Sequence, residues 1–198
     1  MRIISGTSKG KKLRPLRGQP IRPTSDRVKE SIFNILGEWV DGKHVLDLFA
    51  GTGNLGIEAL SRGATRTVFV ERERSAVDLI RKNLSHCGFD DRSHIIRGEV
   101  EQAIRHLHRK GEVFDLIFMD PPYRRGLVQK TLDLLQVRPL YHEDSIVVIE
   151  HDRRETLAEP TGGWTLARKR QFGDTVVSFI APTGECSFKG TVVSAYRS

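Results

Sequence analysis

The sequence has little cysteine, and its two cysteines follow no metal-binding or disulfide spacing. Cys87 and Cys186 stand alone in 198 residues, and the seven histidines form no ligand pattern. No run approaches the roughly 20 apolar residues of a membrane span. The N-terminal stretch MRIISGTSKGKK has no apolar signal core. These absences predict a cytoplasmic protein without a disulfide, a metal site or a membrane span.

Acidic side chains are scarce near the N-terminus, where basic ones gather. Residues 1–29 hold nine Lys or Arg side chains and one acid, Asp26, which gives +8, whereas the whole chain carries +7. A basic segment on a nearly neutral body predicts a polyanionic partner, most simply nucleic acid. A solubilising tail is the alternative, although RIIS, turn residues and KKLRPL favour a short hairpin. The expected phosphate contacts are Lys9, Lys11, Lys12, Arg14, Arg17, Arg22 and Arg27.

The length predicts one domain with a small appendage. From His44 onward, apolar runs alternate with segments of helical spacing, which predicts a parallel α/β sheet covered by helices. Near the end, WTLARKRQF, Gly173-Asp174 and TVVSFIA predict an antiparallel hairpin. The predicted division is a basic arm at 1–24, a domain at 25–182 and an unassigned tail at 183–198. Strands are expected at 44–49, 67–71, 94–97, 114–119 and 145–150, and helices at 54–62, 75–87, 101–110 and 127–136, with a further helix capped by Thr24 or Ser25.

The first expected strand runs into a glycine-rich loop, LDLFAGTGNLG. Gly51, Gly53 and Gly56 match G-x-G-x-x-G, and Glu71 follows at the end of the second strand. This pattern is typical of a dinucleotide site, but Asp47 lies in the strand just before the loop. A carboxylate there repels a pyrophosphate and favours a cation such as the ammonium of S-adenosylmethionine. The sequence therefore favours S-adenosylmethionine over NAD. The alternative is a tight strand-to-helix turn that binds no ligand.

Residues 118–126, FMDPPYRRG, end the fourth strand with an acid and two prolines. In open α/β sheets this edge binds ligands, so we expect Asp120 beside the glycine loop. The Asp120 carboxylate and the Pro121 carbonyl are suited to accept the hydrogens of an exocyclic amine on a base. Pro122 stiffens the backbone, and Tyr123 is expected to stack on the base. The expected contacts to flanking phosphates are Arg124 and Arg125.

These stretches resemble the Rossmann-like, S-adenosylmethionine-dependent amino-methyltransferases with a D/N-P-P-Y motif. More narrowly, the chain resembles the RsmD family, which methylates the N2 amine of one guanine in bacterial 16S ribosomal RNA. The similarity runs from RIISG to FGDTVVSFIAP and includes RPTSDRVKESIFNIL and DPPY. It implies a seven-stranded, mostly parallel sheet with the last strand antiparallel, and a small N-terminal hairpin. It also implies a monomer that acts on an assembling small subunit.

The resemblance further implies roles for single residues. Glu71 would accept hydrogen bonds from the ribose hydroxyls, with Arg72 beside it. Glu99 stands where an acid contacts the adenine amine, and Val100 offers its backbone N–H. The residues that would frame the methionine half of the cofactor are Asp47, Phe49, Gly51, Thr52, Gly53 and Gly56.

Three other functions stay open. An adenine-N6 DNA methyltransferase uses the same D/N-P-P-Y logic, but such enzymes carry a target-recognition domain for which the chain has no room. A NAD-dependent oxidoreductase requires a hydride-transfer residue that the sequence does not offer. A non-catalytic RNA-binding protein would use the basic arm but leave DPPY and Asp47 without a role.

Overall fold

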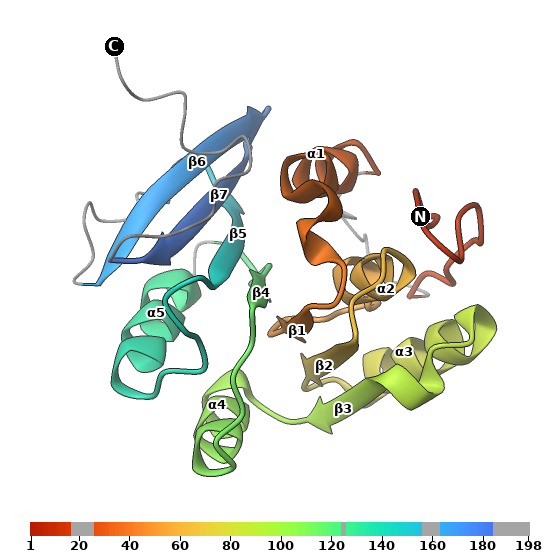
Figure 1. Cartoon of the computed structure of the whole chain (residues 1–198), viewed down its shortest axis with the longest axis horizontal. Helices are drawn as coiled ribbons and strands as arrows, with labels where there is room; N and C mark the ends of the chain where they lie inside the picture. The colour runs from red at the N-terminus through yellow and green to blue at the C-terminus, as the bar shows by residue number, and fades with distance from the viewer. Residues whose placement is uncertain (17–25, 124–125, 156–162, 184–198) are drawn as a thin grey trace.

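Seven strands form one sheet through the centre of the molecule (Figure 1). The computed structural model describes residues 1–16, 26–123, 126–155 and 163–183. The strands are β1 (His44–Asp47), β2 (Arg66–Glu71), β3 (Ser93–Arg97), β4 (Leu116–Met119), β5 (Ile146–Asp152), β6 (Trp164–Phe172) and β7 (Thr175–Pro182). Their order is β3-β2-β1-β4-β5-β7-β6. β7 runs antiparallel to both of its neighbours, β5 and β6, and the pairs among β1 to β5 are parallel, which confirms the predicted architecture.

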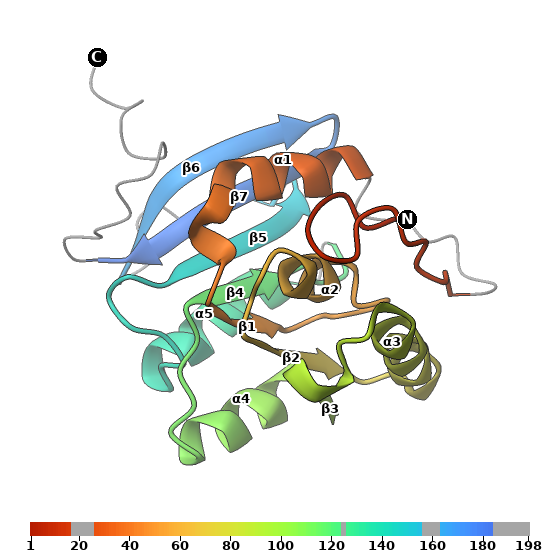
Figure 2. The ribbon, with the colours of Figure 1, turned by 45° about the vertical axis from the view of Figure 1, so that its right-hand side comes forward.

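Helices cover both faces of the sheet, as Figure 2 shows. They are α1 (Asp26–Leu36), α2 (Asn54–Ser61), α3 (Arg74–Cys87), α4 (Val100–Arg109) and α5 (Leu127–Val137), with short 3-10 turns η1 (Gly37–Val40) and η2 (Asp90–Arg92). The first three helices pack on one apolar cluster and the last two on the other. Successive strand residues point to opposite faces, so β1 gives Val45 to the first cluster and Leu46 to the second. Among the described residues, no helix is both long and apolar enough to span a bilayer.

The predicted C-terminal hairpin is confirmed at its predicted turn. Gly173 adopts a φ of 63° between β6 and β7, a conformation in which glycine has no steric cost. β5 extends past its predicted end, because His151 and Asp152 pair with Val176 and Thr175 of β7. The hairpin thus lengthens β5 at the end of the sheet that carries DPPY.

The N-terminal arm is a docked hairpin over the described residues 1–16. Arg2 bridges Lys12 in antiparallel pairing, and Ile3 is buried in the core. Gly6 lies so close to α2 that a Cβ there would sit 1.7 Å from the Ser61 carbonyl oxygen. The prediction of a hairpin is confirmed, and its apolar side belongs to the folded domain.

Lys29, one of the nine basic residues counted in residues 1–29, is not a surface charge as the sequence suggested. Its side chain is fully buried on α1, and its Nζ lies 3.2 Å from Glu58 Oε2. It also donates to the Arg2 carbonyl (2.6 Å) and to Asn54 Oδ1 (2.8 Å). Burial lowers the pKa of Lys29, and Glu58 opposes that shift. This charge therefore joins the arm to α1 and α2 and is not exposed at the surface.

Candidate functional site

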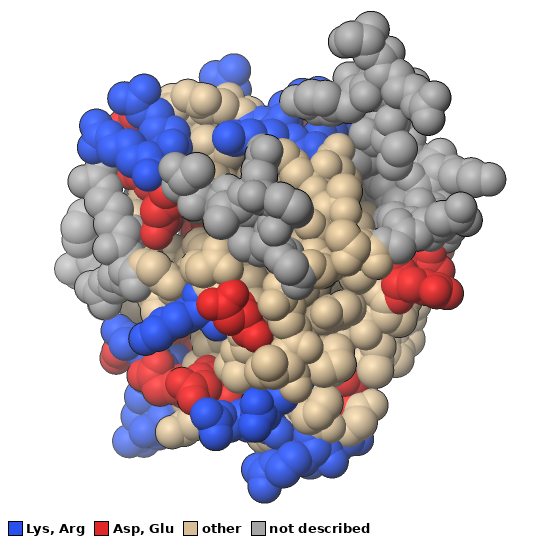
Figure 3. All heavy atoms as spheres, turned by 90° about the vertical axis from the view of Figure 1, so that its left-hand side faces the viewer, with Lys and Arg blue, Asp and Glu red and all other residues tan. Residues whose placement is uncertain are grey.

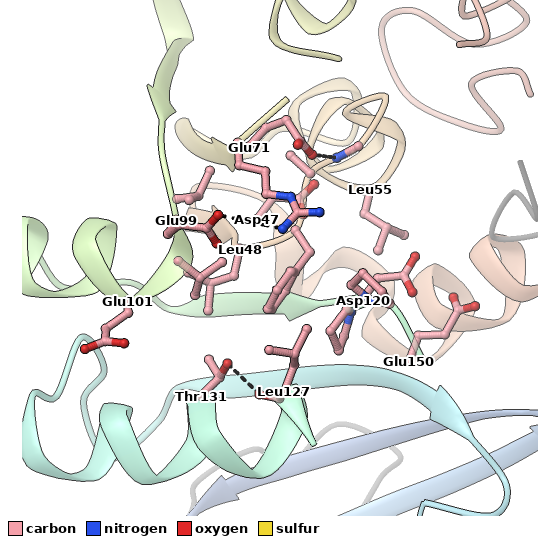
Figure 4. Close-up of a pocket in the computed structure, with 18 of the residues that line it drawn as sticks. Asp47, Leu48, Leu55, Glu71, Glu99, Glu101, Asp120, Leu127, Thr131 and Glu150 are labelled. Carbon is pink, nitrogen blue, oxygen red and sulfur yellow. Dashed lines mark hydrogen bonds and ion pairs between the residues drawn. The ribbon is translucent and has the colours of Figure 1, made fainter. Parts of the chain in front are cut away.

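A cavity of about 1090 Å³ opens at the carboxyl ends of β1, β2 and β4. The strand order reverses between β1 and β4, which is where open α/β sheets bind ligands. Figure 4 shows Glu71 and Glu99 toward one end of this cavity and Asp120 and Glu150 toward the other. The glycine loop and DPPY, distant in sequence, therefore face one space as predicted.

The glycine loop turns sharply between β1 and α2. Gly51 and Gly53 have φ angles of 53° and 78°, which side chains with a Cβ rarely adopt. Gly56 packs against β2, and a Cβ there would lie 2.3 Å from the Phe69 ring. Gly51 and Thr52 line the cavity, whereas Gly53 and Gly56 are not among its lining residues. Gly53 and Gly56 therefore determine the shape of the loop without lining the cavity.

Asp47 is a buried acid in the cavity wall. The residue is 2% exposed, and its Oδ2 accepts a hydrogen bond from the Gly56 N–H at 3.1 Å. Burial raises the pKa of Asp47 to about 7, while the Gly56 N–H opposes the shift and Glu71 adds to it. A cation in the cavity would favour the ionised form, so Asp47 is suited to hold an ammonium group.

Glu71, at the end of β2, joins the glycine loop to the loop after β2. Its Oε2 accepts from the Gly51 N–H and its Oε1 from the Glu73 N–H, both at 2.8 Å. Each carboxylate oxygen keeps acceptor capacity for a further donor. The orientation of Glu71 is therefore fixed before any hydroxyl of a ligand arrives.

The predicted adenine-side residues lie beside Glu71. Arg72 is exposed and pairs with Glu73 at 3.4 Å and with Glu99 at 3.7 Å, which links the loops after β2 and β3. Glu99 and Val100 line the cavity where α4 begins. The first N–H groups of a helix have no partner within it, so this end is open to an acceptor on a ligand.

DPPY follows β4 directly, and Asp120, Pro121, Pro122 and Tyr123 all line the cavity. The Tyr123 hydroxyl lies 3.0 Å from Glu150 Oε1 and 3.1 Å from Thr175 Oγ1. Burial raises the pKa of Tyr123, and Glu150 raises it further. The phenol is therefore neutral, and its ring is tied at the hydroxyl end to β5 and β7.

Glu150 and Thr175 are site residues that the sequence interpretation missed. Glu150 is buried, lines the cavity, and lies on β5 in the run SIVVIE. An acid near the end of an apolar strand was the available signal, since Asp47 was recognised by the same feature. Thr175 gave no comparable signal, because its role depends on how the hairpin folds back.

The predicted RNA contacts separate into two places. Lys9, Lys12 and Arg14 are exposed on the arm, which lies by α2 and α3 (Figure 2). Lys11 Nζ instead donates to the carbonyls of His86 and Cys87 at the end of α3, at 3.3 and 3.4 Å. Arg27 lies apart from the arm, on α1. The residues Arg17, Arg22, Arg124 and Arg125 fall outside the described residues, as do Thr24 and Ser25.

Comparisons with known proteins find relatives that match most of the chain. A family model described as "Conserved hypothetical protein 95" matches residues 1–181. "Putative rRNA methyltransferase YlbH" of Bacillus subtilis is 40% identical, over 93% of this chain and 100% of that protein. "Ribosomal RNA small subunit methyltransferase D" of Escherichia coli K12 is 34% identical, over 87% of this chain and 85% of that protein. The solved structure of "Putative methyltransferase yhhF from Escherichia coli" is 31% identical, with a TM-score of 0.80 over 92% of this chain and 97% of that one.

Proposed function

The chain belongs to the RsmD family, and from that membership we propose that it transfers a methyl group from S-adenosylmethionine to the N2 amine of a guanine in 16S ribosomal RNA. The observation that carries the proposal is the cavity itself. It places a buried acid and a ribose-type acceptor, Asp47 and Glu71, opposite Asp120 and Tyr123. One end suits a cationic cofactor, and the other suits a flat base with an amine.

The residues of the cavity fit S-adenosylmethionine. Asp47 would hold the ammonium, Glu71 the ribose hydroxyls, and Glu99 with the Val100 N–H the adenine edge. When bound, this cofactor supplies a methyl group on a positively charged sulfur. The acid at Asp47 disfavours a pyrophosphate in the same place, which argues against a NAD-dependent oxidoreductase.

The DPPY end would activate the amine. Asp120 and the Pro121 carbonyl would accept the two N2 hydrogens, so that the lone pair points along the cavity toward the methyl carbon. As the N2 nitrogen gains the methyl group, the bond from that carbon to sulfur would break, and Asp120 would take the proton that the amine loses. Tyr123, held at its hydroxyl by Glu150 and Thr175, would stack on the base after it leaves its helix.

Methyl transfer from labelled cofactor tests the proposal. The protein should label 16S ribosomal RNA, and a partly assembled small subunit should be a better acceptor than naked RNA. Duplex DNA should remain unlabelled, and NAD should not compete with S-adenosylhomocysteine for binding. Labelled DNA with unlabelled RNA would instead identify an adenine-type DNA enzyme, and tight NAD binding would identify an oxidoreductase.

A further inference from the structure

A second hollow, of about 420 Å³, lies between α1 and the edge strand β6. Its volume is within the roughly 300–1,000 Å³ of typical ligand pockets. We call it the α1–β6 groove. The residues that matter for its chemistry are Arg27, Glu30 and Asn34 of α1 and Arg168, Arg170 and Phe172 of β6.

Positive charge dominates the α1–β6 groove. Three guanidinium groups line it against one carboxylate, Glu30. Arg168 and Arg170 are two residues apart on β6 and so share a face. Burial lowers the pKa of Arg168, and the charge of Arg170 lowers it further. An anion entering the groove would relieve the repulsion between these two side chains.

The third arginine of the groove lies near an aromatic ring. The Arg27 guanidinium carbon lies 6.0 Å from the centroid of the Phe172 ring, within range of a cation–π contact. Phe172 is partly buried against the core beneath. This contact places the Arg27 guanidinium at the Phe172 end of the groove.

The groove begins next to the DPPY end of the cavity. Phe172 pairs with Thr175 across the hairpin, and the Thr175 Oγ1 lies 3.1 Å from the Tyr123 hydroxyl. Figure 3 shows Lys and Arg side chains along the top of one face, with a further group at its lower end. A chain leaving the base site past Tyr123 would therefore meet Arg27 first, then Arg170 and Arg168.

We infer that the α1–β6 groove binds the phosphates of single-stranded RNA next to the target nucleotide. This inference rests on the proposed function, because it assumes that the base enters beside Tyr123. A row of arginines with few acids fits a phosphate backbone, which such side chains bind without reading sequence. A single strand fits better than a duplex, because the target base must leave its stack.

The test compares substitutions on the two faces of β6. Lys169 lies between the two arginines but points to the opposite face, so Lys169→Ala and Arg170→Ala remove the same charge from neighbouring positions. We expect R168A/R170A to flatten the plot of log RNA affinity against log salt by about 1.4 units, at about 0.7 per phosphate contact. R170A should contribute about half of that change, and K169A almost none. The loss should appear in KM for RNA more than in kcat.

Two further measurements separate the possible failures. S-adenosylhomocysteine affinity should be the same in all the variants, which shows that the double variant is folded. R168K/R170K should restore most of the salt slope, since lysine also binds phosphate. If the wild-type protein methylates RNA but R168A/R170A keeps the wild-type slope and KM, the groove does not bind RNA. The same conclusion follows if K169A flattens the slope and raises KM as much as R170A does. If the wild-type protein methylates no RNA, the proposed function itself fails.

Discussion

The two ends of the cavity are built by different kinds of contact. At the cofactor end, Asp47 and Glu71 accept backbone N–H groups that lie 2 to 20 residues away in sequence. At the base end, Tyr123 is held by side chains 27 and 52 residues away, on β5 and β7. The cofactor end is thus a product of local loop geometry, whereas the base end depends on the antiparallel hairpin. Changes at one end should therefore leave the function of the other intact.

The largest effect should come from Asp120 at the base end. Under the proposed function, Asp120→Ala removes an acceptor for the amine and should lower the single-turnover methyl-transfer rate by about 10²–10³. Affinity for S-adenosylhomocysteine should stay close to that of the wild type, because the cofactor acids are untouched. Asp120→Asn is the matched control, since it keeps the shape and one acceptor, and it should retain more activity. A variant with wild-type rate would remove Asp120 from the chemistry.

At the cofactor end, Glu71→Ala should weaken S-adenosylhomocysteine binding by about 10- to 100-fold. Hydrogen bonds to a charged group are worth roughly 1.5–3 kcal/mol each, and Glu71 also orients the Gly51 N–H. Isothermal calorimetry measures this loss, and RNA affinity should not change. Glu71→Gln keeps one acceptor oxygen, so its affinity for S-adenosylhomocysteine should lie between those of the wild type and Glu71→Ala. Equal losses of cofactor and RNA affinity would mean that the two ends are coupled.

The raised pKa of Asp47 predicts that cofactor affinity depends on pH, whereas RNA affinity should not share this dependence. The folded carboxyl keeps its proton up to about pH 7, and only the ionised form attracts an ammonium. Affinity for S-adenosylhomocysteine should therefore rise with pH, by less than about tenfold per unit, and level off above about pH 7. Calorimetry in buffers of different ionisation enthalpy should detect proton release below that pH. Asp47→Asn should bind more weakly and without this dependence; an identical pH profile in the variant would assign the titration to another group.

The raised pKa of Asp47 also affects folding stability, which should fall with rising pH whereas cofactor affinity rises. Because the folded pKa of Asp47 lies above its unfolded value, its contribution to stability is fully present below the unfolded pKa and is lost as pH rises through about 7. Bound cofactor offsets this loss by pairing the ionised form. The thermal shift produced by S-adenosylhomocysteine should accordingly grow between about pH 5.5 and about pH 8.

The smallest effect on methyl transfer should come from the arm. Its exposed lysines lie at neither end of the cavity. Replacing Lys9 and Lys12 with Ala should flatten the salt dependence of RNA affinity by about 1.4 units if both contact phosphate. Lys11 binds the end of α3, so Lys11→Ala should lower the melting temperature as well. Filter binding over a range of salt concentrations measures the slopes. A slope unchanged in K9A/K12A would leave the arm as a structural element only.

The comparison of the two ends also explains what the sequence could predict. Strand alternation, the glycine loop and DPPY are local patterns, so the sheet order around β1 and β4 and the placement of Asp47 and Asp120 on one cavity followed from them. Glu150 and Thr175 were missed because their role depends on the pairing of β5 with β7. Lys29 was counted as surface charge for a similar reason. Only the packing of the arm on α1 and α2 shows that its partner is Glu58.

The most direct test of the account is the identity of the methylated nucleoside. Small-subunit RNA is incubated with methyl-labelled cofactor and the wild-type protein or Asp120→Asn, then digested and separated into nucleosides. The account predicts that the wild-type protein places all label in N2-methylguanosine and that the variant forms the same product more slowly. Label in N6-methyladenosine, or in a ribose or ring-carbon position, would contradict the assignment of the DPPY end to a guanine amine.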